Sequence, residues 1–528
     1  MSSDLGSRED GEGSDTPGYS HSDRPRPLGP FGSGDGERAP SSYRALPWFT
    51  SMPESGKLPF RTRFAYGIGA TAESSITMAF NSFNFLFYNN VLELSGTLCG
   101  LAVTIALAFD AISDPLVGSI SDRWRSRLGR RHPFLYAAPI PMAICFFAIY
   151  APPTGLGEIA LFLWFTTFTV LLRTAQTLYQ VPHLALGAEM TSGYRERSVL
   201  MSYNTVFGLV GTFGVFFLGW SYFGEIEGGT GNRQGYVVIA TVIAVFSVFV
   251  VYASAFFTRD QIPKLSVPPQ DLPTFSFAEL TKEIRECLQN DNYRTLVFGI
   301  FFLSATLGLH ETLTSHLNVF FWELPPQQIR WMVIGAPIGL ILASILTPIV
   351  HSRWSKRNAL IAGILGMTTA VGTPIVFRLL GLLPENGSTL IFPMLCVFKA
   401  ISYCMSAMMV ISIASTLADV TDEHELLTGR RQEGIFFAAR AFFGKLTTGL
   451  GHLLAGVGMD FIAFPTGSSP GEIAPEIVYR FGVLAGPLTL LPGLVSIVFY
   501  LRYRIDEARH DEIRRALEAR PPRSPKGS

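Results

Sequence analysis

Two carboxylates interrupt a predominantly apolar stretch and are the residues best suited to chemistry. Asp110 and Asp114 lie in FDAISDPLVG, within a hydrophobic run that begins at Leu98. In a helix their i, i+4 spacing stacks both side chains on one face, one turn apart. Each acid costs ~3 kcal/mol at the centre of a membrane helix, and such residues normally face a bundle interior or a water cavity. The pair can bind a monovalent cation or share a proton. The alternative is a structural pair that is neutralised by a nearby base or holds a helix break before Pro115.

Two basic residues in a later apolar segment, AARAFFGKLTTGLG, are the natural partners of these acids. Arg440 and Lys445 can act as counter-charges, or they can bind an anionic group of a substrate. Glu311, in GLHETLTSHLNVFF, is a candidate for gating or substrate contact, while Glu73 and Gln180 are candidates for lining a cavity. These side chains indicate a polar site inside a hydrophobic protein.

The sequence lacks the motifs that would support ATP-driven transport or metal-dependent hydrolysis. Neither a P-loop GxxxxGK nor an HExxH is present. The five cysteines are scattered, without CxxC spacing, which argues against a disulfide framework or a structural zinc site. The formal net charge is +0, whereas a nucleic-acid binder has a concentrated basic face. We therefore expect no enzyme activity, no cofactor, no metal other than a coupling Na⁺ and no nucleic-acid partner.

The composition places the acids and bases in a membrane protein. The chain is 48% hydrophobic and 16% charged, with a mean hydropathy of +0.31, whereas a soluble protein carries about 25% charged residues. A helix needs about 20 mostly apolar residues to span a bilayer. Segments of this length predict twelve transmembrane helices, near 64–89, 98–121, 133–151, 158–188, 200–222, 235–257, 293–321, 328–351, 357–380, 388–418, 434–463 and 476–502.

A polar connection divides the predicted helices into two halves of six, so the expected fold is an all-α membrane protein. This connection contains SFAELTKEIRECL, whose capping box and apolar face predict an amphipathic helix along the membrane surface. The turn SDRWRSRLGRR recurs as HSRWSKRN at the matching position of the second half, which indicates a parallel duplication as in major-facilitator transporters. We expect five parts: a disordered cytoplasmic N-terminal tail (1–59), a six-helix half (60–257), a cytoplasmic central loop (258–292), a second six-helix half (293–502) and a cytoplasmic tail (503–528).

Basic residues predict the orientation of the chain. Lys and Arg concentrate in alternate connections, among them the Arg123–Arg131 cluster, while the other set of loops contains only Arg233 as a base. Cytoplasmic loops carry the excess of Lys and Arg in membrane proteins. Both termini are therefore predicted to be cytoplasmic, with the protein in the plasma (inner) membrane.

Three motifs resemble one family. YGIGATAESS, FDAISDPLVG and ADVTDEHELLTGRRQEGIFFAARAFFGK are similar to segments of the glycoside–pentoside–hexuronide:cation symporter family of the major facilitator superfamily, to which the melibiose permease belongs. The resemblance extends from about Phe64 to Tyr503. It implies the major-facilitator fold, a monomer, a coupling Na⁺ or H⁺ bound by Asp110 and Asp114, and a role for Lys445 near that cation.

The positions that resemble the family's sugar site differ from its pattern. Ser74, preceded by Glu73, stands where the melibiose permease has a sugar-binding aspartate, and Gln180 replaces a second one. Leu184 replaces the tryptophan that stacks on the sugar, and Thr205 stands where an arginine is expected. A sugar site needs convergent hydrogen-bonding groups and an aromatic platform. These differences argue against α-galactosides as substrates.

The resulting functional hypothesis is cation-coupled symport of a small organic solute by alternating access, with a glycoside or related carbohydrate as the simplest cargo. The alternative is Na⁺-dependent transport of a lysophospholipid or other amphiphile, because RQEGIFFAARAFFGKLTTG is similar to a segment of the vertebrate lysophosphatidylcholine transporter and FNSFNFLF would suit an acyl chain. A membrane sensor or scaffold that transports nothing is a third hypothesis, which the buried charges disfavour.

Overall fold

The computed structural model describes residues 57–191, 193–265, 276–429 and 433–519. Within these residues the regular secondary structure is helical, without a strand. The tail predicted over 1–59 lies outside the described residues except for its last three, and so does the stretch 266–275 of the predicted central loop.

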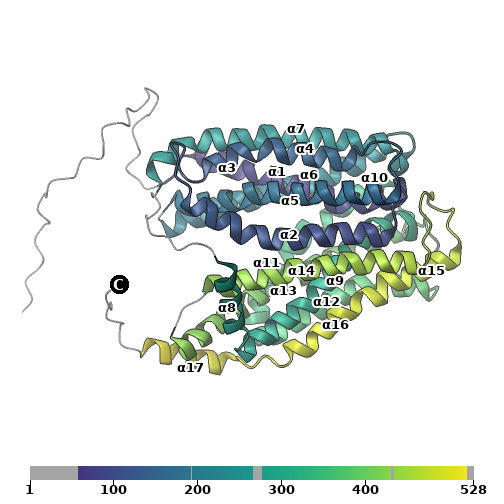
Figure 1. Cartoon of the computed structure of the whole chain (residues 1–528). Helices are drawn as coiled ribbons and strands as arrows, with labels where there is room; N and C mark the ends of the chain where they lie inside the picture. Colours follow the sequence, from purple (N-terminus) through teal and green to yellow (C-terminus); the bar gives the residue numbers. More distant parts are fainter. Residues whose placement is uncertain (1–56, 192, 266–275, 430–432, 520–528) are drawn as a thin grey trace, which may run out of the picture. The chain divides into compact units, whose positions relative to one another are not determined.

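Six long helical segments form the first half of the protein (Figure 1). The third segment breaks at Ala138, because Pro139 has no N–H to continue the hydrogen-bond ladder. The elements of this half are α1 (Phe60–Phe85) with the π-helix η1 (Leu86–Val91), α2 (Gly96–Arg123), α3 (His132–Ala137), α4 (Pro139–Tyr150), α5 (Glu158–Glu189), α6 (Tyr194–Phe223), η2 (Gly229–Gly231), α7 (Arg233–Thr258) and η3 (Arg259–Lys264).

The second half again contains six long segments, preceded by one short helix and followed by another. The short helices are α8, in the predicted central loop, and α17, in the predicted C-terminal tail. The elements are α8 (Phe277–Cys287), α9 (Asp291–His316) with the π-helix η4 (Leu317–Phe321), α10 (Pro326–Ile329), η5 (Arg330–Ile334), α11 (Gly335–His351), α12 (Lys356–Leu379), α13 (Ile391–Thr428), α14 (Glu433–Phe461), α15 (Pro475–Val483), η6 (Leu484–Leu488), α16 (Thr489–Tyr500) and α17 (Glu507–Glu518).

The long segments are suited to a bilayer. Ten of them, among the residues described, are long and apolar enough to cross a membrane. The remaining two, α1 with 26 residues and α14 with 29, reach the same length but carry Glu73 in the first case and Arg440 and Lys445 in the second. The prediction of an all-α membrane protein with two six-helix halves is confirmed.

The two halves repeat an uncommon backbone feature. The first long helix of each half ends in a π-helical turn, where the Leu92 amide donates to the Phe87 carbonyl and the Trp322 amide to the Leu317 carbonyl, both at 3.0 Å. Each turn is followed by a glutamate with positive φ, Glu93 at 58° and Glu323 at 49°. A non-glycine residue rarely adopts this conformation. Its recurrence at matching positions supports the internal duplication that the Arg-Trp turns indicated.

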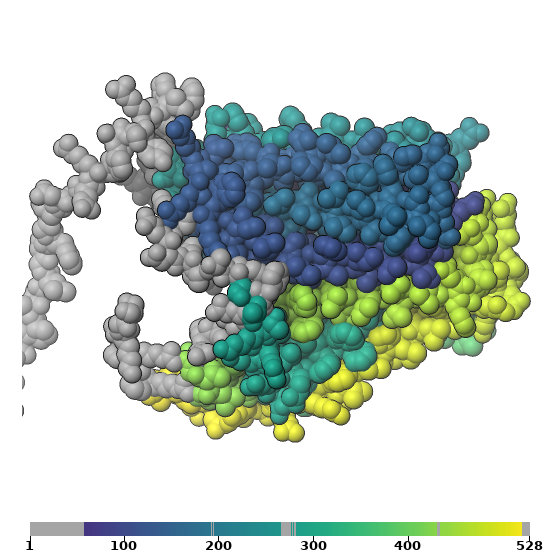
Figure 2. Space-filling view, in the orientation of Figure 1, coloured from purple at the N-terminus to yellow at the C-terminus, as the bar shows by residue number. Residues whose placement is uncertain are grey.

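Helix α2 and helix α14 form the most extensive contact between the two halves. Figure 2 shows their surfaces meeting along the boundary between the halves. Small residues permit this approach: a Cβ added to Gly456 would collide with the carbonyl oxygen of Gly96. The Thr104 hydroxyl donates to the Gly449 carbonyl at 2.6 Å further along the same pair.

The start of α2 is also held by a side chain of α14. Asp460 accepts hydrogen bonds from the Gly96 amide at 2.8 Å and from the Thr97 amide at 2.7 Å. These are unsatisfied donors of the first turn of α2, so a carboxylate there acts as a cap supplied by the other half. The two halves are therefore fastened at the end of α2 that is remote from the Arg123–Arg131 loop.

Candidate functional site

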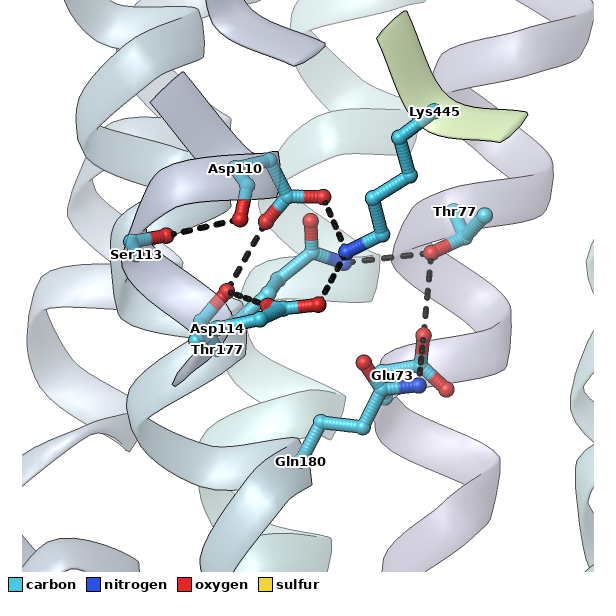
Figure 3. Close-up of polar contacts among 9 residues, drawn as sticks. Glu73, Thr77, Asp110, Ser113, Asp114, Thr177, Gln180 and Lys445 are labelled. Atoms are coloured by element: carbon cyan, nitrogen blue, oxygen red, sulfur yellow. Dashed lines mark hydrogen bonds and ion pairs between the residues drawn. The ribbon is translucent and has the colours of Figure 1, made fainter. Parts of the chain in front are cut away.

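Four side chains from three helices form a compact polar site, which we call the carboxylate site (Figure 3). Lys445 of α14 lies with its Nζ 2.8 Å from Asp110 Oδ2 and 2.5 Å from Asp114 Oδ2. On the other side of the acids, Thr177 Oγ1 of α5 lies 2.8 Å from Asp110 Oδ1 and 3.0 Å from Asp114 Oδ1. Each carboxylate therefore presents one oxygen to the ammonium and the other to the hydroxyl.

Local structure explains why the two acids face the same way. They are one turn apart on α2, as their spacing predicts. Pro115 follows Asp114 inside the helix and removes one backbone donor, and the Ser113 hydroxyl donates to the Asp110 carbonyl at 3.2 Å. Asp110 is 6% exposed, so its charge lies in an environment where the ion pair is weakly screened.

The carboxylate site contains two acidic side chains but one basic side chain to balance their charge. Two carboxylates and one ammonium leave a net charge of −1 when all three groups are charged. The Thr177 hydroxyl has a single proton, yet its oxygen is within hydrogen-bond distance of an oxygen from each acid. Oδ1 of Asp110, Oδ1 of Asp114 and Oγ1 of Thr177 thus lie close together. One further positive charge would neutralise the site, either a proton on a carboxyl group or a monovalent cation. Carboxylate and hydroxyl oxygens are suitable ligands for a hard cation.

A second polar group lies beside the carboxylate site. Glu73 of α1 accepts a hydrogen bond from Gln180 Nε2 of α5 at 3.3 Å and from Thr77 Oγ1 at 3.4 Å (Figure 3). Gln176 Nε2 donates to the same Thr77 hydroxyl at 3.1 Å. Two of the predicted cavity candidates, Glu73 and Gln180, therefore bond to each other.

A third polar contact joins equivalent positions of the two halves. Asn81 of α1 donates to Glu311 Oε1 of α9, and the two residues are 230 positions apart, the same separation as between Glu93 and Glu323. His452 of α14 lies with Nε2 3.9 Å from Glu311 Oε2. Glu311 of α9 therefore contacts side chains of two other helices, α1 and α14, and one of these contacts joins pseudosymmetric positions of the two halves.

A cavity of about 500 Å³ lies between the halves, where residues of α1 and α6 line it together with Glu311 and other residues of the second half. We call it the central cavity. Its lining is mostly apolar, with Phe213 and Phe216 of α6, Met332 of η5 and Leu490 of α16 among the residues that form it. Lys399 of α13 also lines it. A volume of this size suits a small organic ligand, since typical ligand pockets measure about 300–1,000 Å³.

The residues predicted to contact the substrate do not lie together in the structure. Of the six cavity candidates, only Glu311 lines the central cavity. Ser74 lies at the contact of α1 with α6, where its Oγ would be 3.1 Å from a Cβ added to Gly208. Leu184 is 43% exposed. Arg440 is partly buried, and its Nε has no hydrogen-bond acceptor within the described residues.

Two of the polar residues that shape the site were not singled out from the sequence. Thr177 was missed because one threonine in a helix that contains several gives no signal by itself. Asn81 was missed because it lies in the aromatic segment FNSFNFLF, although its equivalence to Glu311 was available from the duplication. No group of three or more His, Cys, Asp or Glu side chains that could hold a metal ion occurs in the described parts of the chain.

Comparison with known proteins gives consistent matches over nearly the whole chain. A family model described as MFS/sugar transport protein matches residues 65–507. The putative glycoside/cation symporter YagG of Escherichia coli (strain K12) is 23% identical to this chain and is aligned over 87% of it and 95% of its own length. The sodium-dependent lysophosphatidylcholine symporter 1-A of Danio rerio is also 23% identical, with 87% and 88% covered. The solved structure of the nucleoside transporter NupG has a TM-score of 0.60 at 12% identity, with 84% of this chain and 100% of that one covered, a likeness of fold alone.

Proposed function

Because this chain belongs to the MFS/sugar transport protein family and has the major-facilitator fold, we propose that it is a secondary symporter that moves a small organic solute together with Na⁺ or H⁺. The carboxylate site is the observation that carries the proposal. Asp110 and Asp114 carry one charge more than Lys445, their one basic partner among the described residues, and with Thr177 they direct three oxygens at one region. No chemical change of the solute is part of the mechanism.

The position of the carboxylate site supports coupling between cation binding and the movement of the two halves. Both acids belong to α2 of the first half, whereas Lys445 belongs to α14 of the second. A cation bound between the acids competes with Lys445 for their charge and so changes the attraction across the boundary. A ligand shifts a conformational equilibrium by its difference in affinity for the two states. Cation occupancy therefore biases the chain towards the state that binds solute, as alternating access requires.

For the solute, a glycoside or related carbohydrate remains the first candidate. A relative is named as a putative glycoside/cation symporter, and hydrogen-bonding side chains such as Asn81 and Glu311 line the central cavity. An amphiphile is the second candidate, and one observation favours it. The central cavity is lined largely by aromatic and aliphatic side chains such as Phe213, Phe216 and Met332, and another relative is named as a lysophosphatidylcholine symporter.

The protein works as an integral membrane protein, and we place it in the plasma (inner) membrane as a monomer. The end of the bundle that carries Arg123–Arg131 faces the cytoplasm, in keeping with the excess of Lys and Arg in cytoplasmic loops. Both termini then lie on the cytoplasmic side. Asp460 fastens α2 to α14 at the other, external end.

The proposal is tested by uptake into proteoliposomes under an imposed inward gradient of Na⁺ or H⁺, with a panel of radiolabelled glycosides and amphiphiles. We expect one gradient to drive accumulation of at least one solute and Asp114→Asn to abolish that accumulation. Ser113→Ala is the matched control on the same helical turn, because within the described residues its hydroxyl donates only to the backbone carbonyl of Asp110. Accumulation by Asp114→Asn at the wild-type level would refute the proposed coupling.

A further inference from the structure

The ammonium group of Lys399 lies at the wall of the central cavity and has no ion-pair partner within the described residues. Lys399 belongs to α13. Its stem packs against α11, where a Cβ added to Gly335 would lie 3.4 Å from both Lys399 Cβ and Cγ. Its Nζ lies 5.5 Å from the ring centroid of Tyr403, another residue of the cavity wall. The ammonium is therefore held at the cavity and does not extend to the membrane surface.

The acidic residue of the cavity wall, Glu311, forms no ion pair with Lys399 within the described residues. Glu311 receives its contacts from Asn81 and His452, which belong to α1 and α14. A cation–π contact with Tyr403 compensates an ammonium only in part. Charged side chains within a membrane protein are costly unless they are paired, and they commonly mark substrate pathways. Within the described residues Lys399 is therefore a cation at the cavity wall without an ion-pair partner, and an anionic group of a ligand can supply one.

Hydroxyl groups beside Lys399 complete a site for an oxyanion. Ser402, Tyr403 and Ser406 follow Lys399 at i+3, i+4 and i+7, so all four lie on one face of α13, and all line the cavity. In the described residues neither serine hydroxyl has a hydrogen-bond partner, whereas many serines in helices donate to the carbonyl four residues earlier. One ammonium and free hydroxyl donors on one face suit a carboxylate or a phosphate.

The other side chains that line the central cavity indicate the chemistry of the rest of the ligand. Beyond the α13 face, the cavity wall contains apolar side chains such as Phe213 and Phe216 of α6 and Met332 of η5, while α1 and α9 also contribute polar ones such as Asn81 and Glu311. Burying apolar ligand surface against Phe213, Phe216 and Met332 is favourable, whereas ligand hydroxyls placed against these three side chains would have no partners there. The cavity of about 500 Å³ therefore combines an oxyanion site on α13 with an apolar surface formed by residues of α6 and η5.

We propose that the central cavity binds the transported solute and that this solute is an amphiphilic monoanion. Its carboxylate or phosphate is bound by Lys399 with Ser402 and Ser406, and its apolar body lies against Phe213 and Phe216. This inference rests on the proposed function, cation-coupled symport. A glycoside meets these requirements only if it also carries an acidic group. One monovalent cation moving with one monoanion carries no net charge, so the transport step is electroneutral.

Binding is tested by thermal unfolding of the protein in lipid nanodiscs with four probes of equal chain length, each below its micelle concentration. Decanoate and decyl methyl phosphate, which are both monoanions at neutral pH, should raise the transition temperature of the wild-type chain, while decanol and decyl glucoside should not. The two anions distinguish a carboxylate from a phosphate source. Lys399→Gln should weaken the binding of the effective anion about 10- to 100-fold, whereas Lys399→Arg, the matched control, should retain most of it.

Stabilisation by decyl glucoside or decanol equal to that by the anions would overturn the inference, and so would unchanged anion affinity in Lys399→Gln. If Lys399→Gln does not fold, the comparison of anionic with neutral probes in the wild-type chain still decides the question. Uptake in proteoliposomes separates this inference from the proposed function. Lys399-dependent anion binding without cation-driven uptake would refute symport alone. Cation-driven uptake of a neutral solute that is unaffected by Lys399→Gln would refute the oxyanion site alone, as would uptake that responds to an imposed membrane potential.

Discussion

Thr177 offers a direct test of the carboxylate site, because its hydroxyl oxygen contacts both acids. Thr177→Val keeps the shape of the side chain and removes the oxygen that lies 2.8 Å from Asp110 and 3.0 Å from Asp114. The side chain is buried, with the residue 2% exposed, so water cannot readily replace the hydroxyl. Hydrogen bonds to charged groups contribute about 1.5–3 kcal/mol.

The effect on cation affinity is smaller than this range, because the hydroxyl stabilises a carboxylate in the cation-free state as well. A net loss of about 1.4 kcal/mol corresponds to a tenfold change in a binding constant. We therefore expect the half-saturating Na⁺ concentration of Thr177→Val to rise about tenfold if Na⁺ is the coupling ion. Proton binding needs no third oxygen ligand, so loss of the hydroxyl should not weaken it.

The assay is the increase in unfolding temperature as NaCl replaces choline chloride at constant ionic strength, repeated at two pH values. Comparing cation-dependent changes removes any general loss of stability caused by the substitution. Thr177→Ser is the matched control and should bind as the wild type does, since it retains the oxygen. If Thr177→Val titrates like Thr177→Ser with both Na⁺ and acid, the threonine oxygen is no part of the cation site and the reasoning fails.

The remaining predictions concern the contact between α2 and α14. In Gly456→Ala the added Cβ collides with the Gly96 carbonyl, so the external ends of α2 and α14 should separate. The reporter is Met459→Cys, introduced into a chain that lacks the five native cysteines, because Met459 is buried beside Gly96. In Gly456→Ala this cysteine should react faster with an impermeant maleimide. Asp460→Ala removes a cap worth about 1 kcal/mol and should raise the same labelling rate about fivefold. Unchanged labelling in both variants would show that these contacts do not hold the external side closed.

The helices were largely predictable because a bilayer imposes one length and one composition on every span. The predicted segment 158–188 corresponds to α5 at Glu158–Glu189, and 357–380 corresponds to α12 at Lys356–Leu379. The π-helical turns that end α1 and α9 were not predictable, since a change from α- to π-helix has no signature in apolar periodicity.

The two acids of the carboxylate site were predictable from the sequence, whereas Thr177 of α5, which contacts both, was not. Asp110 and Asp114 stood out because charged residues are rare in apolar segments and their spacing fixes their common face. Which residue of α5 meets them depends on how α5 packs on α2, and periodicity within either helix leaves this open. The same reasoning applies to Lys399, whose sequence surroundings do not distinguish a side chain that extends to the membrane surface from one that faces a cavity.

The central claim is that Asp110 and Asp114 together bind one monovalent cation, and counting bound cations tests it most directly. Purified protein would be titrated calorimetrically with NaCl against choline chloride and potentiometrically with acid, in parallel with the double variant Asp110→Asn, Asp114→Asn. The account predicts one Na⁺ or one exchangeable proton per chain that the double variant lacks. Identical titrations of the two proteins would contradict it.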